Sequence, residues 1–121
     1  METTVQYQEQ IQYAEVYISD MPALKNVFLQ TQSARAAGAD FGIPFLLAKK
    51  KDGIIMFASL VINEKGKTAF KIHCAKIVTE PEKRNFTVRA ESYFKQNTTP
   101  NFRNPEQLKS SIKSMADWLD F

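Results

Sequence analysis

The side chains best suited to chemistry in this sequence are basic and aromatic, and many of them lie between residues 44 and 95. Apolar runs typical of strands are separated there by turn signals at Asp52-Gly53 and Lys65-Gly66. Lysine and arginine neutralise phosphates, and an exposed tyrosine or histidine ring stacks on an unpaired base. This pattern indicates binding to a polyanion, and single-stranded DNA or RNA is the ligand class that it favours.

Strands at 44–50, 54–63, 68–78 and 85–94 are expected to carry these side chains. Because side chains alternate along a strand, turning the apolar residues of the last two strands to the core leaves their basic and aromatic residues on one outer surface. Tyr93 and His73 are the candidate stacking rings, and the others are candidate phosphate contacts. The full set of candidate nucleic-acid ligands is Lys49, Lys50, Lys51, Lys67, Lys71, His73, Arg89, Tyr93 and Lys95.

A metal-free ribonuclease uses the same residue types, so catalysis is an alternative. Lys71, His73, Arg89 and Tyr93 would then act as acid, base and charge stabilisers. Any basic sheet displays such residues, and we therefore expect a binding protein in preference to an enzyme.

The sequence predicts neither a metal site nor a cofactor. It has one histidine and one cysteine, and its acidic residues lack the spacing of metal ligands. His73 and Cys74 are adjacent, and neighbours on a strand project to opposite faces, so they cannot form a thiolate–imidazole pair there. Cys74 is expected to be a small buried residue, with His73 at least half-exposed.

A second hypothesis is a protein-interaction module, such as an inhibitor, an adaptor or an accessory subunit. Tyr7, Tyr13 and Tyr17 lie in an acidic segment that would form an exposed sheet edge, able to pair with a partner or with a second copy in a homodimer. Trp118 and Phe121 either dock on the domain, which is the favoured interpretation, or anchor a partner.

The two hypotheses predict different surfaces. Nucleic-acid binding requires Lys71, Arg89 and Lys95 to converge with an exposed ring. Protein binding requires an apolar patch surrounded by polar groups, and it tolerates scattered lysines.

The expected fold is α+β, in a single domain over residues 1–121. An antiparallel sheet of four to six strands, with a meander at its core, carries two helices packed mainly on one face. Residues 3–18 read as one or two strands with a bulge or turn near Glu9-Gln10, although the glutamine-rich residues 6–12 fit a helix equally well. One helix begins near Pro22 and ends by Gly38, residues 38–43 form a loop, and a second helix begins at Asn104-Pro105.

Composition supports a globular protein of ordinary size. The chain has 121 residues, of which 44% are hydrophobic, and no apolar run approaches the roughly 20 residues that span a bilayer. The start of the sequence lacks the pattern of a secretory signal and one cysteine permits no internal disulfide, so we expect a cytoplasmic protein without membrane contact. The net charge of +3 is segregated, because residues 1–24 contain no Lys or Arg and residues 49–76 are rich in lysine.

Overall fold

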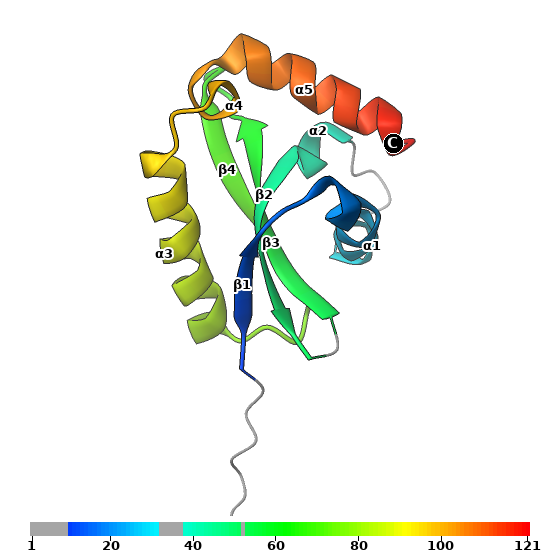
Figure 1. Ribbon diagram of the computed structural model, residues 1–121, viewed down its shortest axis with the longest axis vertical. Coiled ribbons are helices and arrows are strands. Elements are labelled where there is room, and N and C mark those ends of the chain that lie inside the picture. The colour runs from blue at the N-terminus through cyan, green and yellow to red at the C-terminus, as the bar shows by residue number, and fades with distance from the viewer. Residues whose placement is uncertain (1–9, 32–37, 52) are drawn as a thin grey trace, which may run out of the picture.

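The structure, a computed structural model, describes residues 10–31, 38–51 and 53–121. Figure 1 shows the elements, which are β1 (Gln12–Glu15), a 3₁₀ turn (Ile18–Asp20), α1 (Met21–Thr31), α2 (Gly38–Phe41), β2 (Ile43–Lys50), β3 (Gly53–Ile62), β4 (Thr68–Cys74), α3 (Glu80–Gln96), α4 (Pro100–Arg103) and α5 (Pro105–Trp118).

The four strands form one antiparallel sheet in the order β1-β2-β3-β4. Short connections join β2 to β3 and β3 to β4, at the places where the turn signals lie; Asp52 itself is outside the described residues. In the second turn the Asn63 side chain accepts hydrogen bonds from the backbone N–H groups of Lys65 and Lys67, and Gly66 takes the positive φ of 77°. The expected α+β fold with an antiparallel meander is confirmed.

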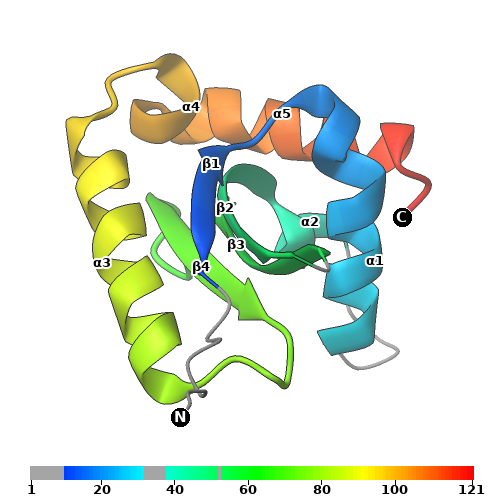
Figure 2. The ribbon, with the colours of Figure 1, turned by 60° about the horizontal axis from the view of Figure 1, so that its bottom comes forward.

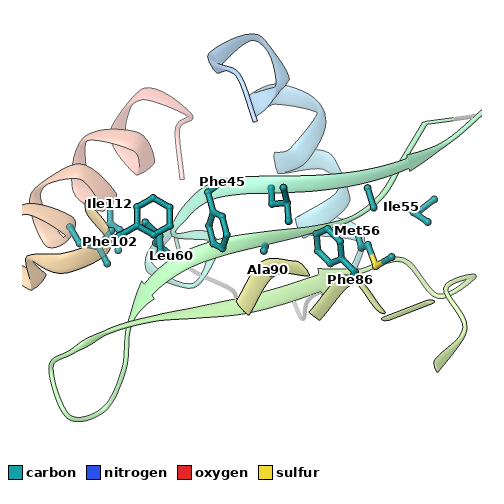
Figure 3. Packing of buried hydrophobic residues seen from close by; sticks show 12 residues of the cluster. Phe45, Ile55, Met56, Leu60, Phe86, Ala90, Phe102 and Ile112 are labelled. Carbon is teal, nitrogen blue, oxygen red and sulfur yellow. The ribbon is translucent and has the colours of Figure 1, made fainter. Parts of the chain in front are cut away.

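Helices cover both faces of this sheet, whereas the sequence suggested one main helical face. Leu46 and Met56 belong to a core cluster with Phe86 and Ala90 of α3, which Figure 3 shows at close range. The next residues along the strands, Leu47 and Phe57, belong to a second cluster with Leu24 and Phe28 of α1. Figures 1 and 2 show α3 and α1 on opposite sides of the sheet. The central strands are apolar on both faces, so each face needs a cover.

The strand predicted at 85–94 is wrong, because these residues belong to helix α3. The helix begins with a capping box: the Thr79 hydroxyl accepts from the Glu82 N–H at 3.3 Å, and the Glu82 carboxylate accepts from the Thr79 N–H at 2.9 Å. Pro81 lies in the first turn. Phe86 and Ala90, four residues apart, are both fully buried, while Val88 between them is 62% exposed. The alternation that suggested a strand is therefore one helical face read with the wrong period.

Other expectations have mixed outcomes. The helix at Asn104-Pro105 is confirmed as α5, whose cap is the Asn104 side chain accepting from two backbone N–H groups. Within 3–18 the described residues form one strand, β1, and residues 1–9 are outside the described part. The first helix, α1, is described over Met21–Thr31, and residues 32–37 before Gly38 are outside the described part of the chain. The loop expected at 38–43 contains the short helix α2.

Gly38 is where α2 meets α5. A Cβ added there would lie 2.5 Å from the Cβ of Ala116, so the two helices approach too closely for any larger residue. Phe121 packs beside this contact on Phe28 and Phe41, with ring centroids at 5.6 and 5.2 Å. The sequence favoured docking of both Trp118 and Phe121. Phe121 does pack on the fold, whereas Trp118 is 56% exposed.

Removing the cap of α3 should destabilise the protein. We expect Thr79→Ala to lower the free energy of unfolding by about 1 kcal/mol, because the Glu82 N–H loses its acceptor. Thr98→Ala, at an exposed position that makes no such cap, is the control and should change it by less than about 0.5 kcal/mol. Urea unfolding followed by far-ultraviolet circular dichroism measures both, and equal effects would contradict a helix starting at Glu80.

Candidate interaction surface

The candidate nucleic-acid ligands do not share one surface. Lys71 extends from β4 on the side of the sheet that carries α2, where its Nζ lies 3.8 Å from Asp40 Oδ1. Arg89, Tyr93 and Lys95 belong to α3, which packs on the opposite face. The prediction that these residues share one outer surface is wrong. It required residues 85–94 to form a strand beside β4, and they belong to helix α3.

His73 is buried, not half-exposed. Its side of β4 faces α1, and its ring lies edge-on to Phe28 and tilted against Phe57 at centroid distances of 5.1 and 5.0 Å. Burial lowers the pKa of His73, although a hydrogen bond to the backbone carbonyl of Asp40 opposes this effect. Its Nε2 has no hydrogen-bond partner among the described residues. An imidazole with 5% of its surface exposed offers no face to a base.

The other candidate ring, Tyr93, is already engaged. It stacks on Phe45 with centroids 5.5 Å apart and also contacts Phe102. Its hydroxyl donates to Glu15 Oε1 at 3.2 Å. Burial, with the Glu15 carboxylate as a second cause, raises the pKa of Tyr93. The side chain therefore joins α3 to β1 and β2, and the ring face that stacks on Phe45 is not available to a base.

The predicted cations are dispersed. Lys49, Lys50 and Lys51 lie at the β2–β3 turn, and Lys67 lies at the opposite end of β3, in the turn before β4. Lys50 forms an ion pair of 3.0 Å with Glu82, which ties the hairpin to the first turn of α3. The pKa of Glu82 is lowered, first by the Thr79 backbone hydrogen bond and then by Lys50. Lys95 pairs with Glu91 along α3.

A groove follows the β1 side of the molecule. Three adjoining hollows of about 420, 480 and 460 Å³ make it up. The first lies between β1 and α3 and includes Tyr13 and Arg89. It shares Tyr93 with the second, which in turn shares Ile43, Asn101 and Gln107 with the third. Figure 2 shows β1 between α3 and α1, with α5 crossing the far end of the sheet.

The third hollow carries an apolar patch on a surface without charge. Ile18 and Trp118, 64% and 56% exposed, both line it. Around them are uncharged polar side chains, and none of the residues lining this hollow is charged. We call Ile18 and Trp118 with these neighbours the Trp118 patch; the neighbours are Asn101, Gln107, Ser110, Ser111 and Ser114.

Sequence reasoning missed most of the Trp118 patch. The signal was present, because Gln107, Ser111, Ser114 and Trp118 recur at intervals of three and four residues and so share one face of α5. That face adjoins the face of α5 that carries the buried Leu108 and Ile112.

The described residues hold no group of three or more His, Cys, Asp or Glu side chains placed to bind a metal ion. In the same part of the chain, every helix is too short or too polar to cross a bilayer.

Acid should weaken the fold through His73. With its pKa lowered below 6.5 in the folded state, the unfolded chain takes up the proton first as the pH falls through 6.5. The stabilisation is thus complete above pH 6.5 and is lost below it. We expect the urea midpoint to fall between pH 7.5 and 5.5, and to fall less in His73→Leu, which removes the titrating group. Equal pH dependence in the two proteins would contradict this burial.

Comparison of the chain with protein-family models, with curated proteins and with solved structures finds no match of significance in any of the three.

Proposed function

We propose that this chain is a protein-interaction module that holds its partner at the Trp118 patch. The observation that carries the proposal is that the exposed Ile18 and Trp118 both line one hollow, together with uncharged polar groups. An apolar patch ringed by polar side chains is the surface that the sequence-based hypothesis of protein binding required.

The composition of the patch supports this function. Protein interfaces are depleted in charge at their centre and enriched in aromatic residues, and tryptophan is among the residue types enriched at their energetic anchors. Charged residues make up 24% of the sequence, yet none lines the third hollow. Tyr17, next to Ile18 in the chain, is a further exposed ring, at 70%.

Single-stranded nucleic acid is the less supported ligand. Binding it through stacking needs cations beside an exposed ring. Ile43, at the start of β2, lines the hollow of Trp118, whereas Lys49 and Lys50 lie at the other end of that strand. A ribonuclease is less supported still, because its candidate acid–base group His73 is buried away from Arg89 and Tyr93. A cytoplasmic location remains a prediction.

The only tryptophan of the sequence lies in the patch, so its fluorescence reports on the proposed interface. Peptides selected from a random library on the immobilised full chain should shift the Trp118 emission to shorter wavelength as they cover the ring. Labelled copies should lose affinity roughly 30-fold or more in Trp118→Ala, the loss typical of an interface anchor, and Ile18→Ser should weaken binding in the same direction.

The matched control is Ile77→Ser, because Ile77 is an exposed apolar residue, at 70%, in the connection between β4 and α3. It should leave the affinity unchanged. The proposal fails if the selected peptides bind the Trp118→Ala and Ile18→Ser proteins as tightly as they bind the natural sequence.

A further inference from the structure

We propose that the partner supplies an extended segment that adds to the sheet beside β1 and places an acidic side chain on Arg89. This inference rests on the proposed function, and it specifies how the partner binds and what chemistry it carries.

The outer side of β1 has hydrogen-bonding groups to offer. β1 is the first strand of the sheet, and no other strand in the described part of the chain pairs with its outer side. The Val16 N–H donates to the Phe45 carbonyl of β2 at 3.3 Å. Because the direction of backbone groups alternates along an antiparallel strand, the N–H and C=O groups of Tyr13 and Glu15 point away from β2. An extended peptide can pair with these groups.

The side chains of such a peptide would have a place to go. Those of Tyr13 and Glu15 lie on the α3 side of the sheet, where Tyr13 stacks on Phe86 and Glu15 accepts from Tyr93. Alternate side chains of an added strand project to the same side. They would enter the first hollow, whose α3 wall includes Arg89, Ser92 and Gln96.

Charge selects the side chain that fits there. The Arg89 guanidinium lies over the Tyr13 ring, 4.0 Å from its centroid, which holds it at the edge of the sheet. Arg89 forms no ion pair with any acidic residue in the described part of the chain. A carboxylate from the partner can bind its planar fork through two parallel hydrogen bonds. Lys49, opposite Gln12 in the register, adds positive charge at the same end of β1.

The groove also fixes the order of the partner's residues. The acidic residue lies near Tyr13, and an apolar residue lies near Ile18 and Trp118, where the groove is uncharged. At about 3.3 Å per residue, the five steps from Tyr13 to Ile18 match about five or six residues of an extended peptide. A nonapeptide is long enough to reach from one to the other.

The test uses the full chain labelled with ¹⁵N and capped nonapeptides without tryptophan. The peptides alternate Thr and Val, carry Leu near one end and Glu, Gln or Lys near the other, and are made in both sequence orders. We expect the better-oriented Glu peptide to slow hydrogen exchange at the Tyr13 and Glu15 amides by about tenfold or more. The amides of Phe70 and Ile72 are the control and should not change. The Ala75 N–H donates to the Ile55 carbonyl of β3, and the direction of backbone groups alternates along the strand. The amides of Phe70 and Ile72 therefore point away from β3, at the outer edge of the sheet.

Affinity measured by Trp118 emission tests the choice of charge. The Glu peptide should bind roughly threefold tighter or more than its Gln counterpart, and the Lys peptide should bind more weakly still. Arg89→Gln should abolish the difference between Glu and Gln peptides. Arg84→Gln, at another exposed position of α3, should preserve it.

The possible failures are distinguishable. Peptides that shift the Trp118 emission without protecting Tyr13 and Glu15 overturn strand addition and leave the proposed function in place. Protection of the two amides that rises with protein concentration in the absence of peptide overturns the inference in favour of a second copy of this chain. Salt-sensitive protection by a single-stranded oligonucleotide, with no effect of any peptide, overturns the inference and the proposed function together.

Discussion

The arrangement of this protein depends on a sheet whose central strands are apolar on both faces. Leu46 and Met56 face one side, Leu47 and Phe57 face the other, and all four are buried. Each face therefore needs a helix over it, and α3 and α1 provide the two covers. Once both are covered, the middle of each face is closed by side chains from α3 or α1. The outer edges of β1 and β4 are not covered by another strand in the described part of the chain.

Docking of α3 also determines which aromatic rings are free. Tyr13 of β1 stacks on Phe86 of α3, and Tyr93 of α3 stacks on Phe45 of β2. The Tyr93 hydroxyl also donates to Glu15 of β1. These contacts hold α3 against β1 and β2. The same contacts form the wall of the groove beside β1 and support Arg89 over Tyr13. The binding surface that we propose therefore lies at the edge of β1 and at the exposed Trp118, away from the basic hairpin.

Local signals predicted the meander and the last helix, because the turn and cap chemistry lies within a few residues: Lys65-Gly66 for one turn and Asn104-Pro105 for the helix. α3 was missed because Phe86 and Ala90 satisfy the period of a strand and that of a helix alike, and the deciding signal, Thr79 with Glu82, lies before them. The burial of His73 follows from α1, an element remote in sequence, which strand alternation does not reveal. The position of Tyr13 on an edge strand was predicted from the sequence. Ile18 and Trp118 are far apart in the sequence, and they come to line one hollow only in the folded protein.

Because helices cover both faces of the sheet, we expect no nucleic-acid surface on it, and titration of a labelled single-stranded oligonucleotide tests this most directly. Fluorescence anisotropy at low and moderate salt, with a duplex as the control, separates simple charge attraction from recognition. We expect at most weak binding that disappears at moderate salt, with no preference for the single strand and no loss in Tyr93→Ala. Micromolar binding that prefers the single strand and weakens in Arg89→Ala and Tyr93→Ala would contradict it.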